Sequence, residues 1–95
     1  MDRTRTLKAL VVDDSAFNRG AISKMLAGDG GIEVVGTAID GVDAIGKTLR
    51  LAPDVIMLDL EMPNMDGFTF LRWLMKERPT PVLVISSRSD SRSAT

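Results

Sequence analysis

The chain has 95 residues, 44% of them hydrophobic and 26% charged, which is enough for one small globular domain. Its 12 basic and 13 acidic residues leave a net charge of −1, so we expect no nucleic-acid binding through a basic surface. The absence of cysteine and histidine excludes disulfides, thiolate or imidazole metal ligands, and Ser-His or Cys-His catalysis. No apolar run approaches the roughly 18 residues of a membrane span and no signal peptide is visible, which favours a cytoplasmic location without membrane contact.

A strand and a helix are predicted at the start of the chain. Residues 9–12 are a continuous run of Ala, Leu and Val, which is typical of a strand buried on both faces. Ser15 can cap a following helix, and Gly28 with Gly30 and Gly31 can end it. One face of this helix carries Phe17, Ala21, Met25 and Leu26.

A second strand and helix follow. Residues 32–38 are mostly apolar but are interrupted by Glu33 and Gly36, which suits a strand nearer the edge of a sheet. Asp40 can cap the next helix, which is expected to stop before Pro53. Its apolar residues are spaced three and four apart and are Val42, Ile45 and Leu49.

The third unit adds two more strands and a helix between them. Residues 55–58 and 82–85 are continuous apolar runs, so both predict buried strands. Asp66 and Gly67 can open a helix that stops before Pro79. The apolar side of this helix is expected to carry Phe68, Leu71 and Leu74 or Met75.

Strands therefore alternate with helices along the whole chain. Short connections between such elements favour right-handed crossovers and a doubly wound parallel sheet with helices on both faces. We expect one α/β domain over residues 1–95, in which residues 88–95 form a polar tail or loop.

Acidic and hydroxyl side chains stand where the predicted strands end. Asp13 and Asp14 follow the first run, Asp59 ends the third, and Ser86 and Ser87 follow the fourth. Ligands of parallel α/β sheets bind outside the carboxyl ends of the strands, so these side chains should converge at one edge. Two carboxylates about 5 Å apart repel by roughly 3 kcal/mol at an effective dielectric constant of about 20. A bound cation would relieve this repulsion, and an all-oxygen site with open positions suits Mg²⁺.

A plainer interpretation applies to each acid taken singly. An Asp that follows a strand is more often a helix cap or a turn residue than a ligand. Three acids at the ends of buried strands favour a cation site for the group, although Asp13 alone could be a cap or a supporting residue.

Three stretches of the sequence resemble the receiver domains of response regulators in two-component phosphorelays. They read VVDDS at 11–15, DLEMPNMDG at 59–67 and PVLVISS at 81–87. The resemblance implies a flavodoxin-like fold with strand order 2-1-3-4-5. Among receivers, the segment IEVVGTA at 32–38 is most similar to the amino-terminal receiver domain of chemotaxis protein-glutamate methylesterases.

The resemblance also implies roles for individual residues. Asp59 would be the phosphoacceptor, Asp14 a direct Mg²⁺ ligand and Asp13 a supporting residue. The backbone carbonyl of Glu61 would complete the protein's share of the metal ligands. Two hydroxyl residues follow the fourth strand: Ser86 would be the switch residue that contacts the phosphoryl group, and Ser87 would leave room beside it.

The same resemblance implies partners. A chemotaxis-type sensor histidine kinase would donate the phosphoryl group, and a methylesterase and glutamine deamidase output domain outside this chain would be regulated. Receivers continue through a fifth strand that bears a phosphate-binding lysine, so we expect this domain to be incomplete after the fourth strand. An exposed fourth strand would then permit self-association.

Two other functions stay open. One is an inert interaction module that has the receiver fold but takes no phosphoryl group. The other is a hydrolase of the aspartyl-phosphate type, for which Glu61 has the spacing of a proton donor two residues after Asp59. No further catalytic lysine or acidic loop follows Glu61. Whether the chain has enzymatic activity of its own is left open, and no esterase site is recognised in it.

Overall fold

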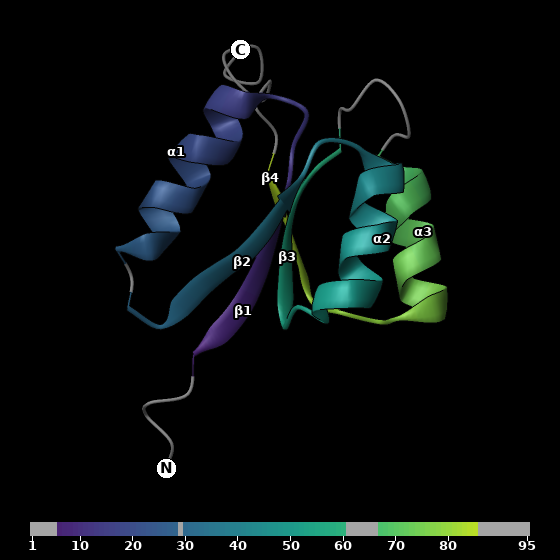
Figure 1. Ribbon diagram of the computed structural model, residues 1–95. Helices are drawn as coiled ribbons and strands as arrows, with labels where there is room; N and C mark the ends of the chain where they lie inside the picture. Colours follow the sequence, from purple (N-terminus) through teal and green to yellow (C-terminus); the bar gives the residue numbers. More distant parts are fainter. Residues whose placement is uncertain (1–5, 29, 61–66, 86–95) are drawn as a thin grey trace, which may run out of the picture.

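The computed structural model describes residues 6–28, 30–60 and 67–85, which form a parallel sheet with helices on both faces (Figure 1). The strands are β1 (Leu7–Val12), β2 (Ile32–Ala38), β3 (Val55–Asp59) and β4 (Val82–Ile85). The helices are α1 (Ala16–Ala27), α2 (Gly41–Leu51) and α3 (Gly67–Glu77). Helix α1 covers one face of the sheet, whereas α2 and α3 lie side by side on the other (Figure 1). The predicted doubly wound α/β architecture is therefore confirmed.

The order of the strands in the sheet is β2-β1-β3-β4, with every neighbouring pair parallel. This order agrees with the first four positions of the flavodoxin-like order that the resemblance implied. Val12 is paired with Ala38 on one side and with Leu58 on the other, and Asp59 is paired with Ile85. The carboxyl ends of all four strands consequently meet at the same edge of the sheet.

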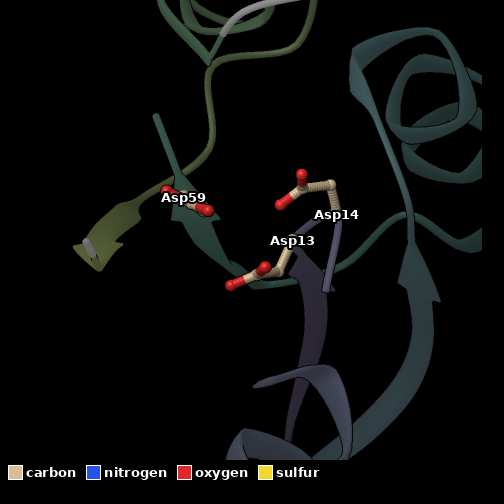
Figure 2. Close-up of side chains that lie close together, drawn as sticks. All are labelled: Asp13, Asp14 and Asp59. Atoms are coloured by element: carbon tan, nitrogen blue, oxygen red, sulfur yellow. The ribbon is translucent and has the colours of Figure 1, made fainter. Parts of the chain in front are cut away.

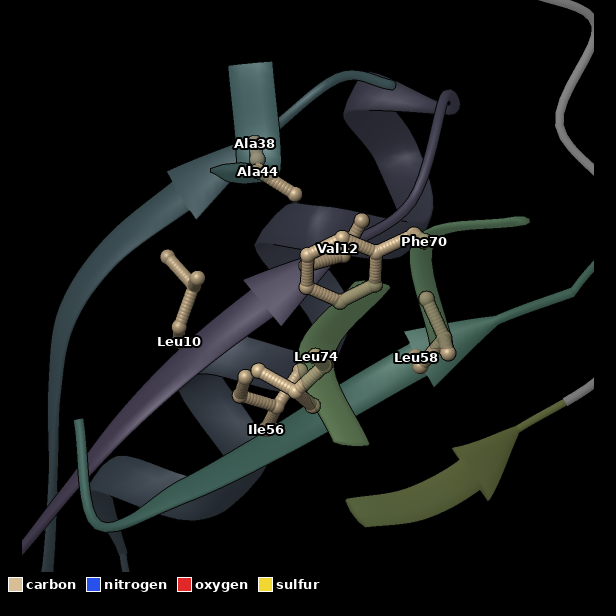
Figure 3. Close-up of a cluster of buried hydrophobic side chains, with 8 residues drawn as sticks. All are labelled: Leu10, Val12, Ala38, Ala44, Ile56, Leu58, Phe70 and Leu74. Atoms are coloured by element: carbon tan, nitrogen blue, oxygen red, sulfur yellow. The ribbon is translucent and has the colours of Figure 1, made fainter. Parts of the chain in front are cut away.

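The two inner strands β1 and β3 supply most of the core. Leu10 and Val12 point toward α2 and α3, whereas Ala9 and Val11 point toward α1, because successive side chains of a strand alternate between its faces. The larger cluster, on the side of α2 and α3, is drawn in Figure 3 and consists of Leu10, Val12, Ala38, Ala44, Ile56, Leu58, Phe70 and Leu74. Burial on both faces explains why these strands are continuous apolar runs.

Helices α1 and α2 begin at this carboxyl edge with the predicted caps. Ser15 is extended, and its Oγ accepts a hydrogen bond from the Asn18 N–H at 3.2 Å. Asp40 does the same for α2, since its Oδ1 accepts from the Asp43 N–H at 2.8 Å. Helix α2 ends at Leu51, and its C-cap Ala52 adopts a left-handed conformation with φ 47°. Capping therefore fixes the points at which the chain leaves the ends of β1 and β2.

The apolar face predicted for α1 faces the sheet only in part, since Leu26 is buried whereas Phe17, Ala21 and Met25 are exposed. Phe17 and Met25 are 81% and 68% exposed, whereas Ile22 and Leu26 are buried against β1 and β3. Apolar residues occupy two adjacent stripes of this helix, and spacing alone does not tell which stripe faces the sheet.

The same ambiguity affects α2 and α3. Of the predicted apolar sides, Val42, Leu49 and Phe68 are exposed. Ile45, Leu71 and Leu74 pack in the core as predicted. The residues that face inward are Gly41, Ala44 and Thr48 of α2 and Gly67, Phe70 and Leu74 of α3. Small inward residues let α2 lie close to the sheet, and they carry too little hydrophobicity to show in the sequence pattern.

Strand β4 is less buried than its apolar run alone indicates, in agreement with the exposed fourth strand that the resemblance implied. Leu83 and Val84 are 54% and 48% exposed, because β4 pairs with β3 alone within the described residues and stands at the edge of their sheet. None of the described helices is long and apolar enough to cross a lipid bilayer.

Candidate metal centre

Three carboxylates meet at the carboxyl edge of the two inner strands. Asp13 and Asp14 follow the last residue of β1, and Asp59 is the last residue of β3. One oxygen from each lies within 4.8 Å of the others, and Figure 2 shows the three side chains around a common space. The predicted convergence of the three carboxylates is therefore present in the fold.

The three acids differ in their exposure to solvent. Asp13 and Asp59 are each 1% exposed, whereas Asp14 is exposed. Carboxylates at this separation repel by about 3 kcal/mol at an effective dielectric constant near 20, and burial makes the repulsion harder to screen. The centre is therefore suited to a cation that enters from the side of Asp14.

Asp13 is held rigidly by its own backbone and side chain. Its N–H donates to the Ala38 carbonyl at 3.0 Å, which ties it to the end of β2. Its Oδ1 accepts a hydrogen bond from the Ser15 N–H at 2.9 Å. Its backbone carbonyl accepts from Nη1 of Arg19 at 2.9 Å. One carboxylate oxygen thus anchors the turn into α1, and the other is left for the centre.

Asp14 lies between two residues that are fixed in this way, and no hydrogen bond to its side chain is found among the described residues. Its carboxylate points toward the space between Asp13 and Asp59 (Figure 2). An exposed carboxylate that is held from its backbone can bind an incoming cation without first losing a protein partner. The expected division between a direct ligand, Asp14, and a supporting residue, Asp13, stays a prediction.

The residues fit Mg²⁺ by the chemistry of their donors. All three are hard carboxylate oxygens, and Mg²⁺ is commonly held by one or two carboxylates while its other positions keep water. Oxygens opposite one another in an octahedral Mg²⁺ shell are about 4 Å apart. The observed limit of 4.8 Å is only slightly wider, so a small inward movement of the side chains would suffice.

Helix α3 packs directly against the end of β3 beside Asp59. The Gly67 N–H donates to the Leu60 carbonyl at 3.1 Å. A Cβ on Gly67 would lie 3.0 Å from the Asp59 carbonyl oxygen, which is closer than ordinary side-chain contacts. Glycine at this position therefore lets α3 begin against the strand that carries Asp59.

Three of the predicted site residues, Glu61, Ser86 and Ser87, lie outside the described residues. One residue that the sequence did not single out does belong to the region, since Arg19 reaches back to Asp13. The available signal was its place four residues after the cap Ser15, which puts both on the same side of α1.

Comparison with known proteins gives a consistent result. Residues 9–95 match the family of the response regulator receiver domain. The chain is 60% identical over 87 residues to protein-glutamate methylesterase/protein-glutamine glutaminase 6 of Anaeromyxobacter dehalogenans, covering 92% of the chain and 25% of that protein. It is 54% identical over 86 residues to protein-glutamate methylesterase/protein-glutamine glutaminase 3 of Geobacter sulfurreducens, covering 90% of the chain and 23% of that protein. The chain therefore spans about a quarter of the length of these relatives.

Solved structures show the same likeness. The response regulator domain of Thermotoga maritima CheB has a TM-score of 0.85 at 42% identity, covering 92% of this chain and 65% of that one. The signal receiver domain of Mycobacterium tuberculosis NarL has a TM-score of 0.82 at 34% identity, covering 93% of this chain and 72% of that one. The predicted resemblance to receivers, including those of the methylesterases, is confirmed. The chain belongs to the family of response regulator receiver domains.

Proposed function

We propose that this chain accepts a phosphoryl group on Asp59 with the help of Mg²⁺. The observation that carries the proposal is the convergence of three carboxylates within 4.8 Å at the carboxyl edge of the sheet, with Asp59 buried at the end of an inner strand. Membership of the receiver family supports the same role.

The chemistry assigned to Asp59 is a single displacement at phosphorus. A carboxylate oxygen of Asp59 forms a bond to phosphorus as the bond from phosphorus to the donor breaks, and the leaving group departs with its electron pair. Mg²⁺, when bound, supplies positive charge that offsets the phosphoryl oxygens and the acids. The rigid strand end holds the Asp59 oxygen in place for attack in line with the leaving group.

The remaining site residues are assigned by the same proposal. Asp14 binds the metal directly, Asp13 supports it, and the Glu61 carbonyl completes the protein's ligands. Ser86 turns its hydroxyl to the phosphoryl group, and the small side chain of Ser87 leaves room for it. These movements would pass the local change in charge to a neighbouring surface.

The partners proposed are a chemotaxis-type sensor histidine kinase as phosphodonor and a methylesterase and glutamine deamidase output domain in a longer protein. The names of the relatives, which couple these two activities in chains about four times as long, support the output domain. A cytoplasmic location agrees with such partners. Self-association through β4 is part of the same proposal, because this strand exposes Leu83 and Val84 at the edge of the described sheet.

Phosphorylation by a small donor tests the proposal directly. The domain, extended through the fifth strand and lysine that the resemblance implies, is incubated with acetyl phosphate and Mg²⁺, and covalent phosphate is detected by the mass of the intact protein. We expect one phosphoryl group to be bound per protein when Mg²⁺ is present. This label should be lost in Asp59→Asn, because the amide cannot attack phosphorus as a carboxylate does.

Asp54→Asn is the matched control. Asp54 precedes β3 at the opposite edge of the sheet, where its Oδ2 accepts from the Lys8 N–H at 2.8 Å, and an amide oxygen can keep that bond. This variant should be labelled as the unaltered extended domain is. Labelling that persists in Asp59→Asn would contradict the acceptor assignment, and no labelling of the unaltered extended domain would favour the inert interaction module.

A further inference from the structure

The hydrogen bond from Arg19 to the backbone of Asp13 joins the first helix to the metal centre. Nη1 of Arg19 donates to the Asp13 carbonyl at 2.9 Å across six positions of the sequence. Arg19 is partly buried and lies near the start of α1, four residues after the cap residue Ser15. A ring of contacts therefore runs from the end of β1 through the cap, along α1 and back to Asp13.

The carbonyl that Arg19 holds belongs to the peptide unit between Asp13 and Asp14. A peptide unit is planar, so fixing the Asp13 oxygen also fixes the nitrogen and the Cα of Asp14. Beyond Asp14, the Ser15 N–H is bound to the Asp13 carboxylate. Arg19 and Ser15 therefore restrain the backbone on both sides of Asp14, the exposed acid of the metal centre.

Arg19 makes this contact without neutralising the acids. Among residues 6–28, 30–60 and 67–85 the ion pair found is between Lys47 and Asp43 of α2, and none joins Arg19 to Asp13 or Asp14. A guanidinium paired with the Asp14 carboxylate would compete with a metal ion for the same oxygens. Donation to a neutral carbonyl avoids that competition and leaves the carboxylate charge available.

We propose that Arg19 is a positioning residue for the metal centre, which holds the Asp13–Asp14 peptide so that the Asp14 carboxylate faces Asp13 and Asp59. The inference rests on the proposed function, because it gives the direct metal ligand a residue that orients it. Residues that orient metal ligands through hydrogen bonds commonly change metal affinity by about 10-fold to 100-fold when they are replaced.

The direction of the change in Mg²⁺ affinity distinguishes a positioning role of Arg19 from an effect of its positive charge. If Arg19 acted through its charge alone, Arg19→Met would tighten Mg²⁺ binding, because a positive group near the cation site would be lost. Positioning predicts the opposite, a loss of about 10-fold in Mg²⁺ affinity. Calorimetric titration of the whole chain with Mg²⁺ measures it. Methionine keeps the helix propensity and the apolar stem of the side chain.

Lys47→Met is the matched control. Lys47 Nζ donates to the Thr37 carbonyl at 2.7 Å, so this variant also removes one positive charge and one bond from a helix to a strand end. It loses in addition the ion pair with Asp43 within α2. The strand concerned is β2, which contributes no acid to the metal centre. Its Mg²⁺ affinity should stay within about twofold of the unaltered value, since the bond lost orients no metal ligand.

A second measurement needs no metal. Without Mg²⁺, the NMR signals of the Asp13 carbonyl carbon and the Asp14 amide should shift in Arg19→Met and stay in place in Lys47→Met. Arg19→Lys retains a donor and a charge on a more flexible stem, so its affinity should lie between those of Arg19→Met and the unaltered chain. If Arg19→Met does not fold, Arg19→Lys carries both measurements.

The outcomes separate the two proposals. Unshifted Asp13 and Asp14 signals, or Mg²⁺ affinity in the Arg19 variants equal to or tighter than that of the unaltered chain, overturn the role of Arg19 alone. Failure of the unaltered chain to bind Mg²⁺ overturns the proposed metal centre, and the metal-free NMR signals then still decide whether Arg19 holds the Asp13–Asp14 peptide.

Discussion

Gly67 lies so close to Leu60 that a Cβ at position 67 would come within 2.5 Å of the Leu60 Cα. Two of the three nearest atoms, the Leu60 Cα and the Asp59 carbonyl oxygen, are backbone, so they cannot turn aside as the end of a side chain does. We expect Gly67→Ala to lower the free energy of unfolding by about 2 kcal/mol, the usual cost of overpacking. Urea denaturation measures this loss.

Gly46→Ala is the control for this prediction. Gly46 lies inside α2, and a Cβ there would meet nothing within 4 Å. Alanine should therefore raise the free energy of unfolding by up to about 1 kcal/mol, because it favours the helix over the unfolded chain. A Gly67→Ala variant as stable as Gly46→Ala would show that α3 does not need its close approach to β3.

The two acids after β1 should contribute differently to metal binding. Asp14→Ala is expected to weaken Mg²⁺ binding more than Asp13→Ala, because the Asp14 carboxylate faces the centre while one Asp13 oxygen is engaged with Ser15. Calorimetric titration of both variants compares them. Equal losses, or a larger loss for Asp13→Ala, would reverse the order of the two ligands.

Urea denaturation of Asp14→Ala and Asp13→Ala in the presence of a chelator checks that the Asp13 carboxylate is engaged with Ser15. Both substitutions remove a charge from a repulsive cluster, but only Asp13→Ala also removes the acceptor of the Ser15 N–H. The metal-free Asp14→Ala chain should therefore be the more stable of the two by about 1 kcal/mol, the net value of one hydrogen bond.

Thr48 carries a buried hydroxyl whose burial is not compensated by a hydrogen bond within the described part of the chain. Its side chain is 1% exposed, and its Oγ1 has no hydrogen-bond partner among the described residues. Thr48→Val keeps the shape and removes the polar atom, so we expect the free energy of unfolding to rise by about 1 kcal/mol. Urea denaturation measures the change, and a less stable variant would mean that the hydroxyl has a partner in solution.

The exposed edge strand predicts self-association of the 95-residue chain. Strand β4 presents Leu83 and Val84 beside unpaired backbone groups of the described sheet, which is a template for pairing with a second copy. The mass measured by light scattering should rise with concentration, and Leu83→Lys should reduce it. Leu49→Lys changes a similarly exposed leucine of α2 and should not. A monomer at high concentration would contradict the prediction.

Elements defined by continuous runs and caps could be predicted from the sequence, whereas the orientation of the helices could not. The ends of β1 and β3 were placed correctly, because burial on both faces leaves an unbroken apolar run that stops at Asp13 and at Asp59. The exact faces of the helices were not, since each helix carries further apolar residues and only packing selects those that meet the sheet. Leu26, Ile45 and Leu74 pack in the core as predicted, whereas Phe17, Val42 and Phe68 are exposed.

Arg19 was missed for a related reason. Its role depends on a contact with a backbone carbonyl, and a carbonyl is present at every position of every sequence. Only the geometry of the turn between β1 and α1 shows which carbonyl the guanidinium reaches.

The placement of Asp13 and Asp59 after the two inner strands also determines how the centre can be lost. These strands are packed on both faces, and strands of this kind exchange their amide hydrogens only when the whole domain opens. Fraying of a helix end or of an edge strand therefore leaves the acids together. Inactivation by heat or denaturant should be all-or-none for the centre, with no folded subpopulation in which the two strand ends have separated.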